Sequence, residues 1–392
     1  MADSKEEDNN KTERRIGSRE ALEKRLALRP DEAAFFDAAG PGTGGPGRGA
    51  PVLPLAITPY YLDLAAREEG IRRQCVPTVR ELDVKYYEYA DPLHEHLYSP
   101  VPRLVHRYPD RALLLAADAC AVACRHCFRR YLTCGVREGG AGGNGGPGTD
   151  GGISLEELEE VESYLDEHPG IREVIVSGGD PLTLDDERLF AVVRGAAGRG
   201  AVGRRAAGAG SDRRRTVRIA SRIPVVMPRR ITSDLAAGLR SAGAAWFVTQ
   251  FNHPAELTAE ALAATGRLID AGIPVLNQAV LLNGINDRAE ILAELFTGLV
   301  TARVKPYYLF QGDLAAGTSH LRVNLERGLG LVRKLRSLVS GLAMPVYAVD
   351  LPEGGGKVPL HDRSIVGRER GREGEWYLLE DAAGRKFRYP AE

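Results

Sequence analysis

Short apolar runs rich in branched side chains alternate with longer amphipathic runs along most of the chain. The apolar runs have the length of buried β-strands, and the amphipathic runs have the apolar spacing of α-helices. The predicted strands are residues 112–117, 173–177, 217–221, 246–251, 274–281 and 305–310. The predicted helices between them are residues 155–167, 185–193, 233–242, 259–271 and 289–299. This alternation is typical of parallel strands that are joined by helical crossovers.

Six strand-helix units of this kind predict an α/β fold with an open, partial (β/α)6 barrel. A complete barrel needs eight units and usually about 250 residues. In such folds the functional side chains gather at the carboxyl ends of the strands. We therefore expect the chemistry of this chain to lie in the loops that follow the strands.

The pattern changes on both sides of the barrel and divides the chain into four parts. The parts are residues 1–50, 51–110, 111–312 and 313–392. In the first part we expect a charged, disordered tail to about residue 18, a helix over residues 21–39 and a Gly-Pro-rich linker. The second and fourth parts are extensions of the barrel. Two Gly-rich stretches, residues 139–152 and 195–215, are predicted to be loop insertions.

Composition and charge narrow the classes of protein. The net charge of the 392-residue chain is -1, which gives no general reason to expect a nucleic-acid or membrane partner. The sequence has no apolar run of about 18 residues and no signal-peptide pattern at its start. Five clustered cysteines fit a reducing compartment better than a disulfide framework, so we expect a cytoplasmic protein.

Three cysteines follow the first predicted strand with the spacing C-x3-C-x2-C. Cys120, Cys124 and Cys127 can hold three irons of a four-iron cluster and leave the fourth iron open. A zinc site usually draws four ligands from separated pairs, and the chain has no second pair. Three buried cysteines that act as small apolar groups are a weaker alternative, because polar neighbours such as His126 surround them. The spacing resembles the signature of radical S-adenosylmethionine (SAM) enzymes, in which SAM occupies the open iron.

A glycine pair follows the second predicted strand, in the segment Ser177, Gly178, Gly179 and Asp180. Glycines at a turn allow the backbone to approach a ligand closely. An ordinary turn between a strand and a helix would look the same. The segment resembles the Gly-Gly-Glu-like turn that receives the amino group of SAM in radical SAM enzymes.

Two further segments have features of a pyridoxal phosphate (PLP) site. Lys357 follows three glycines, and a lysine on a flexible arm is suited to a Schiff base with PLP. From this segment alone a surface turn is an equal alternative. Arg107, Tyr108 and Arg111 lie just before the first strand of the barrel and can together bind a phosphate, although alone they would be only a charged turn.

Taken in order, these motifs resemble the lysine 2,3-aminomutase family of PLP-dependent radical SAM enzymes. The matching segments are 58–61, 102–111, 120–130, 177–182, 221–226, 251–254, 277–278, 317–320 and 354–357. They span residues 57 to about 365. Members of the family adopt a partial (β/α) barrel and move an α-amino group to the β carbon. The resemblance implies a radical 1,2-amino shift that interconverts L-lysine and L-β-lysine.

The resemblance also implies roles for single residues. Cys120, Cys124 and Cys127 would bind the [4Fe-4S] cluster, and Lys357 would bind PLP. Arg129 would hold the α-carboxylate of the substrate. Asp313 and Asp350 would receive the side-chain ammonium of lysine, and two carboxylates disfavour glutamate because they would face an unpaired negative charge. Other residues would contact the cofactors. They are His126, Gln278, the turn at residues 177–180, and Arg107, Tyr108 and Arg111, which would bind the phosphate of PLP.

Alternatives remain at this point. A related enzyme could act on arginine, or could supply β-lysine for the modification of elongation factor P. A protein of a different class would bind RNA through the Arg-Gly stretch at residues 195–215. The family further implies a reducing electron donor, such as flavodoxin or ferredoxin, and a homo-oligomer. The chain departs from some members because it has no cysteine after Cys134 for a C-terminal zinc site.

Overall fold

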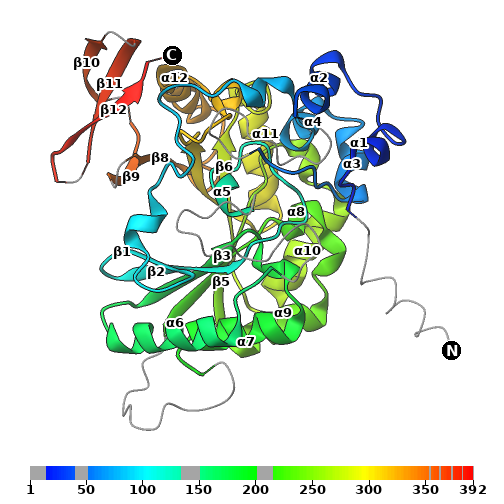
Figure 1. Ribbon diagram of the computed structural model, residues 1–392, viewed down its shortest axis with the longest axis vertical. Helices are drawn as coiled ribbons and strands as arrows, with labels where there is room; N and C mark the ends of the chain where they lie inside the picture. The colour runs from blue at the N-terminus through cyan, green and yellow to red at the C-terminus, as the bar shows by residue number, and fades with distance from the viewer. Residues whose placement is uncertain are drawn as a thin grey trace.

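A nine-stranded sheet, with its strands in sequence order, forms the centre of the computed structural model (Figure 1). The structure describes residues 15–39, 52–133, 151–200, 215–352, 355–361, 363–371, 374–381 and 383–391. The strands are β1 (Leu104–Tyr108), β2 (Arg111–Ala117), β3 (Glu173–Gly178), β4 (Thr216–Ala220), β5 (Ala244–Thr249), β6 (Val275–Leu281), β7 (Lys305–Gln311), β8 (Val346–Leu351) and β9 (Gly356–Pro359). Neighbouring strands from β2 to β8 are parallel, and β1 and β9 are antiparallel edges. The sheet is therefore open, because its first and last strands do not pair.

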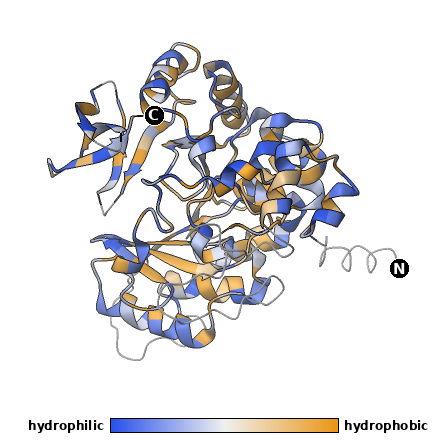
Figure 2. Ribbon diagram, turned by 45° about the horizontal axis from the view of Figure 1, so that its top comes forward, coloured by the Kyte–Doolittle hydropathy of each residue, from blue (hydrophilic) through white to orange (hydrophobic). Residues whose placement is uncertain are grey.

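The crossover helices lie around the outside of the curved sheet (Figure 1). They are α5 (Arg130–Thr133), α6 (Leu155–Glu167), α7 (Asp186–Ala196), α8 (Ile223–Val226), α9 (Ser233–Ala242), α10 (Ala259–Asp270), α11 (Ala289–Thr301) and α12 (Leu325–Leu335). In α6 the buried residues Leu158, Val161 and Leu165 form one apolar stripe, and Ser154 caps the first turn. Figure 2 shows the same division, with apolar colour on the strands and alternating apolar and polar faces on the helices.

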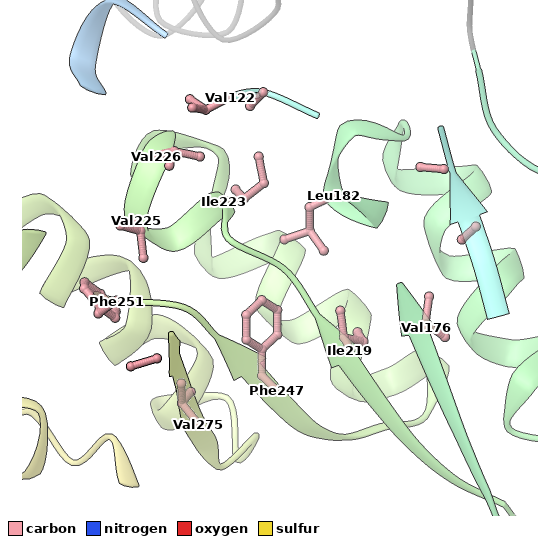
Figure 3. Packing of buried hydrophobic residues seen from close by; sticks show 14 of the residues in the cluster. Val122, Val176, Leu182, Ile219, Ile223, Val225, Val226, Phe247, Phe251 and Val275 are labelled. Atoms are coloured by element: carbon pink, nitrogen blue, oxygen red, sulfur yellow. The ribbon is translucent and has the colours of Figure 1, made fainter. Parts of the chain in front are cut away.

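Side chains from successive strands form one continuous core beneath the site. Val176, Ile219, Phe247 and Val275 come from β3, β4, β5 and β6, and each is at most 2% exposed (Figure 3). Leu182 and the apolar residues of α8 close this layer near the carboxyl ends of the strands. Because these buried side chains are closely packed, they hold the strand ends in fixed relative positions.

The predicted strands are confirmed, and no strand end differs from its expected position by more than two residues. The pattern missed β1, β8 and β9, which are short or interrupted by charged residues. It also missed a separate antiparallel sheet of β10 (Ile365–Gly371), β11 (Gly374–Glu380) and β12 (Lys386–Pro390). This sheet lies beside the main body (Figure 1), where Trp376 packs edge-on against Tyr86 and Tyr87.

The expected single helix at residues 21–39 is wrong. The structure has α1 (Arg19–Glu23) and α2 (Pro30–Ala39), because Pro30 starts a new helix at a position where its missing N–H costs nothing. The tail is also shorter than expected, since Ile16 is buried and pairs with the backbone of Ile57. The remainder of the N-terminal part contains α3 (Pro59–Ala65), α4 (Glu69–Cys75), η3 (Val79–Leu82) and η4 (Glu95–Tyr98).

The insertions fall mostly outside the described residues, as do residues 1–14 and the linker at 40–51. The second insertion begins later than expected, because α7 continues to Ala196. Among the described residues, no helix is both long enough and apolar enough to cross a membrane.

Candidate active site

The carboxyl ends of the parallel strands surround a cavity of about 560 Å³. All residues that the sequence analysis assigned to the site line this cavity. They are Arg107, Tyr108, Arg111, Cys120, Cys124, His126, Cys127, Arg129, Ser177, Gly178, Gly179, Asp180, Gln278, Asp313, Asp350 and Lys357. Residues that are up to 250 positions apart in the sequence therefore share one space.

The three cysteines lie on the loop between β2 and α5. Burial and the neighbouring thiols raise the pKa of Cys120 well above its usual range and that of Cys127 to about 11. These thiols therefore keep their protons until a metal displaces them. Among the described residues, no three Cys, His, Asp or Glu side chains lie close enough together to hold a single metal ion. A four-iron cluster binds each cysteine at a different iron, so the arrangement fits a cluster better than one zinc ion.

His126, between two of these cysteines, has one ring nitrogen engaged and one unpaired. Its Nε2 lies 3.0 Å from Gln250 Nε2 and 3.4 Å from Asn252 Nδ2. Side-chain amide nitrogens donate, so Nε2 accepts and the hydrogen of the neutral ring is on Nδ1. Burial, with Arg222 nearby, lowers the pKa of His126 well below its usual range. Nδ1 is buried and has no hydrogen-bond partner among the described residues, which fits a ligand that accepts a hydrogen bond beside the cysteine loop.

The glycine pair after β3 is required by the protein's own packing. Gly178 has a φ of 116°, and a Cβ atom there would lie 2.4 Å from the carbonyl oxygen of Ala117. A Cβ atom on Gly179 would lie 2.5 Å from the carbonyl oxygen of Ala119. The turn is thus pressed against the chain that leads into the cysteine loop, and this contact explains both glycines without a ligand.

Asp180 joins the ends of two strands. Its carboxylate accepts hydrogen bonds from Ser221 Oγ at 2.7 Å and from the backbone N–H of Arg222 at 2.8 Å. Burial raises the pKa of Asp180 to about 6. The carboxylate still faces the cavity, but its first function is to hold the turn after β3 against the turn after β4.

A second group of cavity residues has the donors that a PLP site would need. Lys357 on β9 lies opposite Asp350 on β8, and its Nζ is 2.5 Å from Asp350 Oδ2. The backbone N–H of Lys357 donates to Tyr108 Oη at 3.1 Å. Arg107 Nη2 is buried without a hydrogen-bond partner among the described residues, as expected for a guanidinium that binds an anion. Arg111 lies over the ring of Tyr108 and pairs with Asp110 at 2.8 Å.

Asp313 and Asp350 both line the cavity, close enough for one carboxylate to affect the other electrostatically. Burial and the carboxylate of Asp350 raise the pKa of Asp313 to about 7. Below that pH Asp313 is neutral, and above it the pair attracts a cation.

This titration predicts a pH dependence. For a cationic amino acid, kcat/KM is expected to fall as the pH drops through about 7, because protonated Asp313 no longer attracts the substrate. A series of kcat/KM values across this range would measure it. The Asp313→Asn variant should lose this step, and a variant that keeps it would assign the titration to another group.

Arg129 reaches the cavity from the cysteine loop, but part of its guanidinium is already paired. Nη2 lies 2.7 Å from Glu95 Oε1, and Nε lies 2.9 Å from Glu95 Oε2. Tyr131 Oη donates to the same carboxylate at 2.5 Å. Burial opposes ionisation of Glu95, but Arg129 and Tyr131 outweigh it and lower the pKa of Glu95. A substrate carboxylate would therefore meet a guanidinium whose orientation Glu95 already determines.

Sequence reasoning gave no role to Glu95, or to Arg222 of the matching segment 221–226, and both line the cavity. Arg222 follows β4 directly, so the rule that placed the cysteines and the glycine turn would have found it. Glu95 lies in η4, outside the barrel and 34 residues before Arg129, and no pattern connects the two.

The fold and the cysteine loop define a radical SAM enzyme, and residues 115–296 match the model of the Radical SAM superfamily. Enzymes of this class use a [4Fe-4S] cluster and SAM. The chain is 38% identical over 348 residues to L-lysine 2,3-aminomutase of Fusobacterium nucleatum, across 88% of this chain and 76% of that protein. It is 37% identical over 361 residues to L-lysine 2,3-aminomutase of Acetoanaerobium sticklandii, across 91% of this chain and 79% of that protein.

Glutamate 2,3-aminomutase of Clostridioides difficile is also similar, with 36% identity over 316 residues, 80% of this chain and 69% of that protein. This chain belongs to the lysine 2,3-aminomutase family, which confirms the resemblance seen in its motifs. Because relatives with different substrates have similar identities, the substrate has to be argued from the cavity.

Proposed function

We propose that this protein interconverts L-lysine and L-β-lysine by a radical 1,2-amino shift, with PLP bound at Lys357. The observation that carries the proposal is the contact between Asp350 and a primary ammonium, that of Lys357, at 2.5 Å. Once Lys357 binds PLP, Asp350 and Asp313 lose this cation and are left as two carboxylates at one wall of the cavity. A second ammonium group, at the end of a lysine side chain, restores the charge balance.

The remaining groups of the cavity have the polarity that a diamino acid requires. Arg129 lies on the cysteine loop and can pair with the α-carboxylate, while Asp313 and Asp350 lie on the β7–β9 side. Glutamate would bring its side-chain carboxylate towards two carboxylates, and an unpaired buried charge is costly. Arginine carries the correct charge on a longer side chain, so it remains the second candidate.

The cluster, SAM and PLP supply a radical initiator and an unsaturated group that makes the amino shift possible. The protein's own residues bind and orient. Asp350 Oδ2 can take the proton that Lys357 Nζ must lose before its nitrogen reacts. Arg107, whose Nη2 has no partner among the described residues, can hold the phosphate, and the ring centroid of Phe310 lies 3.9 Å from Lys357 Nζ. Fixing both ends of the substrate keeps its β carbon in one position relative to the cysteine loop.

The direct test is anaerobic reconstitution with iron, sulfide, PLP, SAM and dithionite, followed by product analysis with lysine, arginine and glutamate in competition. The proposal predicts β-lysine as the main product. A main product from arginine or glutamate would contradict the substrate and leave the aminomutase class intact. An external reductant, such as a flavodoxin or ferredoxin, would replace dithionite in the cell.

Neutralising either aspartate should weaken lysine processing. Above pH 7, where Asp313 is ionised, we expect Asp313→Asn and Asp350→Asn to lower kcat/KM for lysine by roughly 2–5 kcal/mol, which is about 30-fold to several thousand-fold, because each leaves one buried charge without its partner. Iron content should stay normal, and so should the PLP absorbance at equilibrium, because water can take the proton of Lys357 when residue 350 cannot. Asp287→Asn is a matched control, since Asp287 is a partly buried aspartate that pairs with Arg327 at 2.6 Å outside the cavity. Unchanged lysine kinetics in both active-site variants would refute the substrate assignment.

A further inference from the structure

Arg222 is a buried cation whose guanidinium touches a cysteine of the cluster loop. It follows β4, is 7% exposed, and its Nη1 donates to Cys124 Sγ at 2.7 Å. Neither the substrate-binding groups nor the PLP-binding groups described above contact this nitrogen. The guanidinium therefore has a function that belongs to the cysteine loop.

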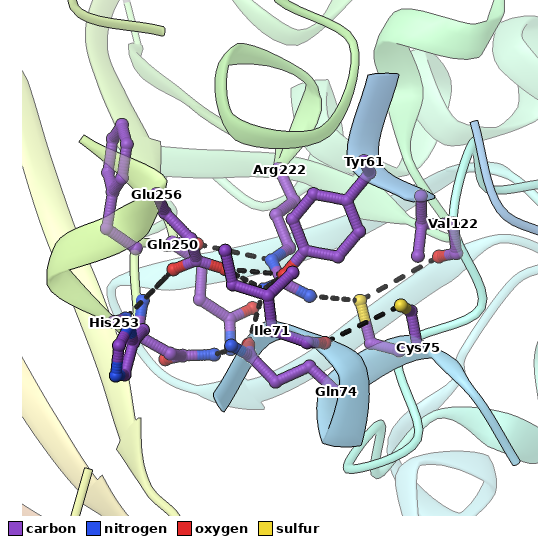
Figure 4. A network of polar contacts seen from close by, with 12 residues as sticks. Tyr61, Ile71, Gln74, Cys75, Val122, Arg222, Gln250, His253 and Glu256 are labelled. Atoms are coloured by element: carbon purple, nitrogen blue, oxygen red, sulfur yellow. Dashed lines mark hydrogen bonds and ion pairs between the residues drawn. The ribbon is translucent and has the colours of Figure 1, made fainter. Parts of the chain in front are cut away.

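A frame of polar groups holds the rest of this guanidinium (Figure 4). Its Nη2 lies 2.8 Å from Glu256 Oε1, 2.9 Å from Tyr61 Oη and 2.6 Å from Gln74 Oε1. Its Nε donates to the carbonyl oxygen of Gln250 at 3.2 Å. These partners come from α3, α4, the loop after β5 and η7 (Pro254–Glu256). Four separate segments therefore fix the orientation in which Arg222 Nη1 donates to Cys124 Sγ.

The frame itself is closed and buried. Glu256 is fully buried and also accepts hydrogen bonds from Tyr61 Oη at 2.5 Å and from the backbone N–H of His253 at 3.0 Å. Removing two ions from water is expensive, and a buried ion pair is often no better for stability than apolar packing. The buried Arg222–Glu256 pair therefore does little for stability, and its remaining N–H donates to Cys124 Sγ. Both observations point to a function beyond folding.

We propose that Arg222 is a positioning residue that donates an N–H···S hydrogen bond to Cys124 in the cluster-loaded enzyme and raises the reduction potential of the cluster. Hydrogen bonds to cluster sulfurs and nearby positive charge favour the reduced, more negative cluster. Glu256 limits the effect, because its carboxylate offsets the charge of Arg222. The inference rests on a cluster held by the three cysteines and is independent of which amino acid is the substrate.

Two substitutions should therefore shift the potential in opposite directions. Arg222→Gln removes the cation and should make the potential more negative. Glu256→Gln leaves the cation uncompensated and should make the potential less negative. We expect each shift to change the ratio of reduced to oxidised cluster at least tenfold at a fixed potential, or about 59 mV for a one-electron couple. EPR-monitored potentiometry of the reconstituted protein without amino acid measures both, with iron content as the loading control.

Controls separate this effect from a loss of stability. Arg72→Gln removes another buried guanidinium, which pairs with Glu32 at 2.5 Å and donates to the carbonyl oxygen of Ala27, and should leave the potential unchanged. Arg222→Lys keeps the charge but not the guanidinium, so it should make the potential more negative by a smaller amount than Arg222→Gln. It replaces Arg222→Gln in the test if that variant fails to load a cluster. Shifts of the same sign in the Arg222→Gln and Glu256→Gln variants, or unchanged potentials in loaded Arg222→Lys and Glu256→Gln, would overturn the proposal. A wrong substrate assignment would leave all these potentials unaffected.

Discussion

The Lys357→Ala variant is expected to lose both PLP and turnover while its iron-sulfur absorbance stays normal. Lys357 is the lysine that lines the cavity, and its Nζ lies 2.5 Å from a carboxylate that can accept its proton. A covalent bond to PLP needs such an amine, and none of the other described residues that line the cavity is a lysine. Absorbance spectra before and after removal of unbound PLP, with an iron assay, would measure the two cofactors separately.

Two further variants test why PLP is lost. Lys357→Arg keeps a cation beside Asp350 but has no amine that reacts with an aldehyde, so it should also lose the PLP band. Lys305→Ala removes a partly buried lysine whose Nζ donates to the carbonyl oxygens of Leu342 and Met344 at the start of β7, and it should keep PLP. Normal PLP absorbance in Lys357→Ala would refute the assignment, and loss in Lys305→Ala would show that the assay reports stability instead.

Local pattern predicted the barrel well because parallel strands with helical crossovers leave a strong periodic signal. The six apolar runs became β2 to β7, and the rule that functional groups follow strands placed the cysteines and the Ser177–Asp180 turn at one cavity. The same rule explains why Arg222 could have been found. Edge strands such as β1 and β9 are short and carry polar residues such as Arg107 and Lys357, so they leave no apolar run to detect.

Other parts of the site depend on tertiary contacts that sequence does not encode locally. Asp350 and Lys357 are seven residues apart, and only the pairing of β8 with β9 brings them face to face. Glu95 contacts Arg129 because η4, which lies before the barrel in the sequence, packs against the cysteine loop. The glycines at 178 and 179 could serve either a ligand or an ordinary turn, and the atoms nearest to an added Cβ belong to Ala117 and Ala119. In each case the physical reason appears only when distant segments are packed together.

Replacing any one of Cys120, Cys124 or Cys127 with alanine should abolish the cluster and all cleavage of SAM. In a cluster held by these three residues each thiolate would bind a different iron, so its loss would expose one corner of the cluster to solvent and to oxidation. Iron and sulfide content and the visible absorbance of the reconstituted protein would measure the loss. PLP binding should persist, because Lys357 and Arg107 come from β9 and β1 and not from the cysteine loop.

Cys75 provides the matched control, because it is fully buried close to the same loop but does not line the cavity (Figure 4). It lies on α4 and not on the cysteine loop, and its Sγ donates to the carbonyl oxygen of Ile71 at 3.5 Å. Cys75→Ala should therefore keep a complete cluster, as should Cys134→Ala, which lies outside the described residues. If the cluster survives Cys124→Ala but is lost in Cys75→Ala, Cys75 and not Cys124 is the ligand. That result would also refute the role inferred for Arg222.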